Sequence, residues 1–215
     1  MQYAIIGAGG TGGVVGYFMT KAGKDVTLIA RGRHLEAMKK HGLTLERLWD
    51  PNPETIDVKA TDMEHYEERP DVILVCVKGY SLEDTVSFIR RVAKPDTIVI
   101  PILNIYGTGA KLQKELPELL VTDGCIYVSA NIKEPGVLLQ HGKILRIVYG
   151  VREKAEERPE LEQIRQDFTD SSIDGILSEN IRREALEKFS YVSPIGAAGL
   201  YCNAVAGDFQ KEGAP

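Results

Sequence analysis

The chain has 215 residues, of which 43% are hydrophobic and 27% charged, a balance typical of a globular protein with room for a sizeable core. Its net charge of -5 is offset by no basic stripe, which argues against a nucleic-acid-binding protein. No apolar run approaches the ~18 residues that a membrane span needs, and the N-terminus lacks the features of a secretory signal. Three isolated cysteines without a CxxC pair suit a reducing compartment, so we expect a cytoplasmic protein.

Short β-branched runs alternate with amphipathic stretches over most of the chain. This alternation predicts an α/β fold with a mostly parallel sheet that is covered by helices on both faces. The predicted strands are residues 3–6, 26–29, 72–77, 97–102 and 121–128, and the predicted helices are residues 11–22, 34–41, 82–93 and 109–116.

Less regular segments interrupt and follow this alternation. Residues 49–53 predict a loop between short strands at 43–48 and 55–60. Glu134-Pro135-Gly136 predicts a turn, and with a further strand it indicates antiparallel pieces at the end of the sheet. The strands around the turn are 126–132, 137–140 and 144–149. A polar helix is predicted at 161–168, and a helix apolar on several faces at 189–206, which is typical of the inside of a helical bundle.

A glycine-rich motif follows the first predicted strand and opens the first predicted helix. It reads Gly7-Ala8-Gly9-Gly10-Thr11-Gly12, in the context that the dinucleotide fingerprint of Rossmann-type domains requires. Gly7 would make the tight turn, Gly9 would admit the pyrophosphate, and Gly12 would let helix and strand pack closely. Backbone amides at the helix N-terminus would bind the phosphates. We therefore expect residues 7–12 to bind a dinucleotide.

The end of the second predicted strand bears on which dinucleotide is bound. NAD-specific proteins place an acidic residue there, but this chain reads Ala30-Arg31-Gly32-Arg33. A guanidinium forms paired hydrogen bonds with a phosphate, so Arg31 predicts NADP(H) as the cofactor. The alternative is that Arg31 and Arg33 are surface residues at a strand end.

Two further candidates follow predicted strands at the edge where ligands bind in such sheets. Lys78 comes directly after residues 72–77, and Asn104 follows residues 97–102. Each could equally be an ordinary polar residue at the end of a strand. His34 and His41 share a helix face but lack a third ligand, so no metal site is predicted.

Lys188 lies in an otherwise apolar helical stripe. Partial burial there would lower the pKa of its amine and suit proton donation near neutral pH. The alternative is a lysine whose stem covers apolar surface while its amine reaches water. The stripe consists of Ile181, Ala185, Lys188, Val192 and Ile195.

Together these residues resemble the ketopantoate reductase (2-dehydropantoate 2-reductase) family. The resemblance rests on residues 4–13, 26–32 and 71–78, on Glu134-Pro135-Gly136 with its flanking strands, and on residues 181–189, all in the family's order. It implies a Rossmann domain followed by an all-helical domain, with the active site between them. It also implies reduction of ketopantoate to pantoate by NADPH, on the way to pantothenate and coenzyme A.

The resemblance implies a role for each candidate. Arg31 would hold the 2′-phosphate, Lys78 and Asn104 would line the cofactor cleft, and Lys188 would donate a proton to the ketone oxygen. The family's helical domain continues beyond the length of this chain. We therefore expect an NADP-binding domain over residues 1–168 and only the beginning of a helical substrate and dimerisation domain over residues 169–215. A small helical appendage packed on the sheet or on a second copy is the alternative.

Three functions stay open on the sequence. The first is a reductase of a 2-oxo acid of the ketopantoate type. The second is a non-catalytic NADP-binding fragment. The third, a reductase of another small 2-oxo acid, is favoured by Val192 and Gly196, which stand where the family often has asparagine. The apolar helix also predicts self-association as a homodimer.

Overall fold

The centre of the molecule is a six-stranded sheet in which every pairing is parallel. The computed structural model describes residues 1–205 and 207–211. The strand order, β5-β2-β1-β6-β7-β8, is the order of a Rossmann sheet, with the reversal between β1 and β6. The predicted fold class is therefore confirmed. The strands are β1 (Gln2–Ile6), β2 (Asp25–Ile29), β5 (Lys59–Thr61), β6 (Val72–Val75), β7 (Ile98–Pro101) and β8 (Leu120–Val121).

Helices cover both faces of this sheet, as alternating side chains along its strands require. In β1, Tyr3 and Ile5 join one buried cluster with residues of α1 and α5. Ala4 and Ile6 join a second cluster with residues of α3 and α4. The helices are α1 (Gly10–Lys21), α2 (Gly32–His41), α3 (Asp84–Val92), α4 (Thr108–Glu115), α5 (Pro159–Asp170) and α6 (Ile181–Cys202), with short 3-10 turns η1 (Gly79–Ser81), η2 (Lys154–Glu156) and η3 (Asp208–Gln210).

A second sheet of four strands lies against α1. Its order is β10 (Ala130–Glu134), β11 (Val137–Gln140), β3 (Leu43–Arg47) and β4 (Asp50–Ile56). The prediction of a loop at 49–53 is wrong from Asp50 onward, because β4 begins there and contains Pro51 and Pro53. A proline is tolerated there because β4 is an edge strand, where one side of the backbone needs no partner. The predicted strand 55–60 divides between β4 and β5, which belong to different sheets.

A third sheet joins β13 (Asp174–Leu177), β12 (Arg146–Gly150) and β9 (Asp123–Tyr127). The predicted strand 121–128 is divided in the same way, since β8 ends in the central sheet and β9 begins in this one. The expected antiparallel pieces therefore form separate sheets and do not extend the central one. Strand β13, which pairs parallel to β12, was not predicted.

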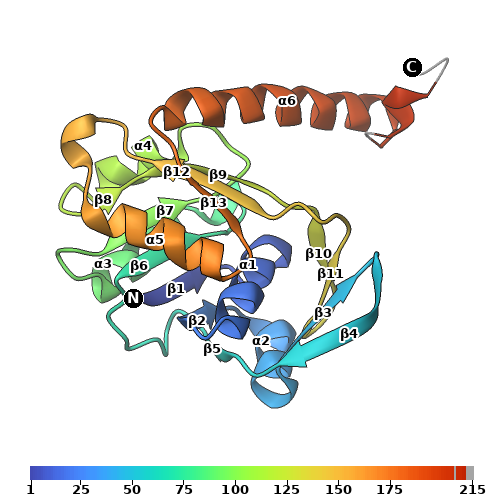
Figure 1. The fold of residues 1–215 in the computed structure, drawn as a ribbon, viewed down its shortest axis with the longest axis horizontal. Helices are drawn as coiled ribbons and strands as arrows, with labels where there is room; N and C mark the ends of the chain where they lie inside the picture. The colour runs from blue at the N-terminus through green and yellow to red at the C-terminus, as the bar shows by residue number, and fades with distance from the viewer. Residues whose placement is uncertain (206, 212–215) are drawn as a thin grey trace.

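Helix α6 packs on the third sheet at its beginning and extends beyond the body afterwards (Figure 1). Its N-cap Asn180 accepts a hydrogen bond from the Arg183 amide at 3.2 Å. Ile181 is buried with Cys125 and Val148. The predicted helix 189–206 is thus the outer part of α6, which begins earlier and already ends at Cys202; position 206 lies outside the described residues. In the part of the chain that the structure describes, no helix combines the length and apolar character of a membrane span.

Candidate functional site

Four predicted site residues follow four adjacent strands of the central sheet. In the order β2, β1, β6 and β7, the strands lead into Arg31, Gly7, Lys78 and Asn104. All four strands run in the same direction, so these residues share one edge. The outermost of these strands, β2 and β7, are three strand spacings apart, which is about 14 Å. The reversal of strand order between β1 and β6 places the ligand crevice of such sheets at the middle of this edge.

The glycine-rich loop turns sharply between β1 and α1. Gly7 has a φ of 95°, and the amides of Gly7 and Ala8 both donate to the Ile29 carbonyl, at 3.0 and 3.1 Å. A Cβ atom on Gly12 would lie 2.4 Å from the Gly7 carbonyl oxygen, so only glycine permits this approach of helix and strand. A Cβ on Gly9 would meet no atom within 4 Å. The loop is therefore tight toward the sheet and open at Gly9.

The N-terminus of α1 offers free backbone amides next to this opening. The helix begins at Gly10, with Thr11 in its first turn, and no side chain caps it within the described residues. A Cβ on Gly10 would lie 2.4 Å from the Ala130 carbonyl oxygen, so β10 sits directly against the start of the helix. Uncapped amides and the helix dipole together favour an anion such as a phosphate.

The neighbouring strand end carries the arginines. Arg31 is the N-cap residue of α2, and it is exposed together with Gly32 and Arg33. No acidic side chain follows β2 before α2 begins. A guanidinium here lies one strand away from the glycine-rich loop.

On the other side of the loop, the segments after β6 and β7 contact each other. Lys78 is exposed and precedes η1. A Cβ on Gly79 would lie 2.2 Å from Ile105 Cδ1, so the segment after Lys78 touches the segment that carries Asn104. The two predicted residues therefore belong to adjoining loops.

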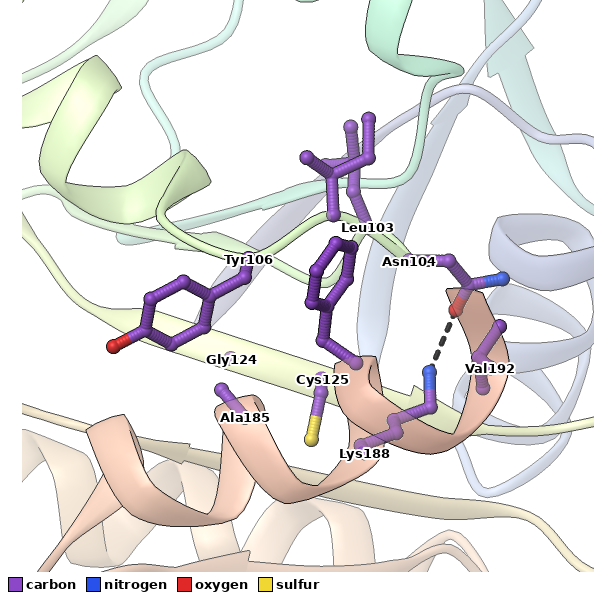
Figure 2. A pocket seen from close by; sticks show the side chains of 10 residues that line it. Leu103, Asn104, Tyr106, Gly124, Cys125, Ala185, Lys188 and Val192 are labelled. Carbon is purple, nitrogen blue, oxygen red and sulfur yellow. Dashed lines mark hydrogen bonds between the residues drawn. The ribbon is translucent and has the colours of Figure 1, made fainter. Parts of the chain in front are cut away.

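Lys188 reaches this edge from α6. Its Nζ donates to Asn104 Oδ1 at 2.6 Å (Figure 2) and lies 5.4 Å from the centre of the Tyr127 ring. Lys188 is 9% exposed, which disfavours the alternative of an amine held in water. Burial lowers the pKa of Lys188, and the neighbouring Cys125 opposes that shift. The amine thus meets neutral partners, and within the described ranges no carboxylate forms an ion pair with it.

A small pocket lies between α6 and the segment after β7 (Figure 2). Its wall is mainly apolar, and burial raises the pKa of the Cys125 thiol, which is part of that wall. The centres of the Tyr106 and Phe189 rings, both of which line the pocket, lie 6.3 Å apart. The lining residues are Leu103, Asn104, Ile105, Tyr106, Gly124, Cys125, Ala185, Lys188, Phe189 and Val192.

Two residues near the predicted site were missed from the sequence. Tyr127 comes beside Lys188 only because β9 leaves the central sheet, and nothing in the local sequence signals that. His34 contacts the glycine-rich loop through the Ala8 carbonyl, 2.9 Å from its Nε2. From the sequence His34 was considered only as a metal ligand, because its backbone partners at Ala8 and Gly136 become neighbours only in the folded chain.

Most of the chain matches the model of a known protein family. The model of the family "Ketopantoate reductase PanE/ApbA" matches residues 3–154. The chain belongs to the ketopantoate reductase family. The resemblance inferred from the sequence is therefore confirmed, and the ketopantoate reductase family comprises NAD(P)-dependent oxidoreductases.

Curated relatives match most of this chain at 24–32% identity. A 2-dehydropantoate 2-reductase of Pyrococcus horikoshii is 32% identical over 200 residues, which are 92% of this chain and 64% of the relative. An uncharacterised oxidoreductase of Bacillus subtilis, YkpB, is 24% identical, with 90% of this chain and 62% of the relative covered. The chain thus spans less than two thirds of the length of these relatives.

Solved structures share the fold. The 2-dehydropantoate 2-reductase of Porphyromonas gingivalis matches 99% of this chain and 76% of its own, with a TM-score of 0.86 and 24% identity. A D-mandelate dehydrogenase with NADH and anilino(oxo)acetate matches 87% of this chain and 60% of its own, with a TM-score of 0.78 and 23% identity. At these identities the likeness concerns the fold alone.

Proposed function

We propose that the protein is an NADPH-dependent reductase that converts 2-dehydropantoate (ketopantoate) to pantoate, a step toward pantothenate and coenzyme A. Because the chain spans less than two thirds of its relatives, the activity of the whole protein is part of this proposal. The observation that supports it most is the 2.6 Å hydrogen bond from Lys188 Nζ to Asn104 Oδ1. This contact lies at the edge of the central sheet where the glycine-rich loop is also found.

The proposed cofactor is NADP(H). Residues 7–12 would hold the pyrophosphate, since the loop is open at Gly9 and the α1 amides are uncapped. Arg31 would pair with the 2′-phosphate, because a guanidinium attracts this group and a carboxylate would repel it. Lys78 and Asn104 would line the cleft beside the nicotinamide. When bound, the cofactor supplies the hydride.

Lys188 would donate the proton. A carbonyl that accepts hydride at C2 develops negative charge on its oxygen, and the ammonium of Lys188 would stabilise that charge and then protonate it. Burial lowers the pKa of Lys188 toward the range where an amine gives up its proton readily. Asn104 would aim the ammonium, since its amide oxygen accepts from Nζ.

A reductase of another 2-oxo acid is the second candidate. Part of the wall of the pocket beside Lys188 is apolar: its side chains offer no hydrogen bond to a substrate hydroxyl at Leu103, Ile105, Phe189 and Val192. Such a wall favours a 2-oxo acid with an apolar side chain.

The experiment uses the full chain with NADPH or NADH and a panel of 2-oxo acids, followed by the absorbance of the reduced cofactor. We expect NADPH and ketopantoate to give the highest kcat/KM. Lys188→Ala should lower turnover by about 10²- to 10⁴-fold and change NADPH affinity far less. Lys114→Ala, at an exposed position of α4, is the matched control.

Each other outcome has a distinct meaning. Preference for a different acid supports the second candidate. Binding of NADPH without oxidation by any acid supports the non-catalytic alternative. Absence of binding, or a clear preference for NADH, contradicts the cofactor assignment. Equal losses of turnover and affinity in Lys188→Ala contradict the role of that residue.

The domain organisation and the partners are also proposals. We propose a nucleotide-binding unit over residues 1–168 and the beginning of a helical unit over 169–215. Within the second range, β13 still pairs with β12 as far as Leu177, and α6 begins at Ile181. We propose a homodimer through the outer part of α6, where Tyr191, Leu200 and Tyr201 are exposed. The free thiols support a cytoplasmic location.

A further inference from the structure

His34 bridges two segments that are far apart in the sequence. It lies in the first turn of α2 and is half-buried. Its Nε2 is 2.9 Å from the carbonyl oxygen of Ala8, in the glycine-rich loop. Its Nδ1 is 3.0 Å from the backbone nitrogen of Gly136, in the turn between β10 and β11. Both ring nitrogens therefore have a fixed backbone partner.

These two partners determine the state of the ring. The Gly136 amide can only donate, so Nδ1 must carry a lone pair. The Ala8 carbonyl can only accept, so Nε2 must carry the hydrogen. His34 is consequently neutral in this arrangement. Burial lowers the pKa of His34, with the bond to Ala8 acting in the opposite direction.

The bridge joins the parts of the proposed cofactor site. Ala8 belongs to the loop that would hold the pyrophosphate, and α2 begins directly after Arg31. The turn is fixed in its own right, since Gly136 has a φ of 82° and a Cβ there would lie 3.0 Å from Ala37 Cβ. His34 therefore adds a side-chain link between the Arg31 end of α2, the glycine-rich loop and the turn, beside the hydrogen bonds from the Gly7 and Ala8 amides to Ile29.

We propose that His34 is a positioning residue for the dinucleotide, which holds the Arg31 guanidinium and the glycine-rich loop at the separation that the phosphates of NADP(H) require. This inference rests on the proposed cofactor. Protonation of Nδ1 replaces the acceptor with a donor that faces the Gly136 N–H, so the bridge to the turn breaks. The hydrogen bond from Nε2 to Ala8 survives, but the ring loses its anchor on the turn, so cofactor affinity falls when His34 becomes charged.

Other charged groups on the surrounding elements do not reproduce this behaviour. The glycine-rich loop has no ionisable side chain. Near the bridge, α2 and its N-cap carry exposed charged or titratable side chains, and β10 carries Lys133 and Glu134. Those of α2 and its N-cap are Arg31, Arg33, Glu36, Lys39, Lys40 and His41. His41 is present in every protein compared below, so its titration cancels in the comparison. Lys133 forms an ion pair with Glu46 at 2.7 Å. Arginine, lysine and glutamate keep their charges across the range in which histidine titrates.

The test is a titration of NADP⁺ binding to the full chain from about pH 8 to about pH 5. His34→Gln keeps one donor and one acceptor but does not titrate, whereas His34→Ala removes both. At the upper pH we expect His34→Ala to bind roughly 5- to 30-fold more weakly, and His34→Gln to stay within about threefold of the unmodified protein. At the lower pH the affinity of the unmodified protein should fall relative to that of His34→Gln. The 2′-phosphate titrates equally in both proteins, so their ratio isolates His34.

A second measurement needs no cofactor. Long-range ¹H–¹⁵N spectra of histidine-labelled protein report the tautomer and charge of each ring. We expect His34 as the Nε2–H tautomer near neutral pH, with a pKa below the ordinary 6.5. The opposite tautomer, a charged ring near neutral pH, or identical pH profiles for the unmodified protein and His34→Gln would overturn the inference. If NADP⁺ does not bind at all while the tautomer is as expected, the cofactor proposal fails and the positioning role falls with it.

Discussion

The two ends of α6 differ sharply although they belong to one helix. At its beginning Ile181 is 1% exposed and packs with Cys125 and Val148, and Lys188 is buried two turns later. Near its end Leu200 is 88% and Tyr201 93% exposed. The helix therefore has its tertiary support at one end only (Figure 1). Stability and the candidate site both depend on the supported end, whereas the outer end is available for another contact.

The largest expected effect comes from the supported end. Ile181→Ala should lower the free energy of unfolding by about 2–5 kcal/mol, because it leaves a cavity between α6 and the third sheet. Urea unfolding checks this value. The matched control, Leu200→Ala, removes a similar side chain at the outer end and should change the free energy by less than ~0.5 kcal/mol. Similar losses in both variants would contradict the comparison.

A buried polar network in the body gives the second prediction. Asp167, 5% exposed, accepts hydrogen bonds from Tyr3 Oη at 2.5 Å and Lys24 Nζ at 2.9 Å. Burial acts to raise the pKa of Asp167, but the bonds from Tyr3 and Lys24 hold it below the ordinary 3.8. Because the folded-state pKa is depressed, this stabilisation is complete above the ordinary value. It is lost as the pH falls from that value through the folded-state pKa.

Asp167→Asn should therefore lower the free energy of unfolding by about 1–3 kcal/mol near neutral pH and flatten its decline in acid. Unfolding by urea at a series of pH values measures both. The control is Asp170→Asn, which also removes a partner of Lys24 but from a side chain that is 45% exposed. It should cost less than ~1 kcal/mol. An unchanged acid profile in Asp167→Asn would show that this network does not control acid stability.

The smallest effect on stability is expected at the outer end of α6. Leu200→Ser together with Tyr201→Ser should leave the free energy of unfolding within about 0.5 kcal/mol, since both side chains are almost fully exposed. The same pair should abolish self-association, as measured by light scattering. A monomeric unmodified protein would contradict the proposed homodimer, and a dimer that survives both changes would place the contact elsewhere.

The sequence predicted the central sheet and the residues at its edge because their signals are local. A few residues are enough to recognise the glycine-rich motif and the absence of an acid after the second strand. The stripe around Lys188 can be recognised within one helix. Local signals failed where one apolar run serves two sheets. The run around Thr122 leaves the central sheet there, and nothing in its hydrophobicity marks the change. Strand β13 was not predicted, because its first residues, Asp174-Gly175, lack the alternation of apolar and polar side chains that marks a strand.

The edge strand β4 and the bridge at His34 could not be predicted for a different reason. Pro51 and Pro53 favour a loop unless the strand is known to lie at an edge, and only the complete sheet shows that. The role of His34 depends on a hydrogen bond from the Gly136 amide, and Gly136 is distant in the sequence.

The pairing of β3 with β11 has a consequence for how the chain folds during synthesis. Thr44 of β3 pairs with Val137 of β11, so the β3–β4 hairpin leaves the ribosome long before its partner strand. Until then one edge of the hairpin has unpaired amides and carbonyls, which can bind another nascent chain. Contacts between segments this distant also slow folding. Chaperone dependence should therefore be greatest for nascent chains that end between β4 and β11.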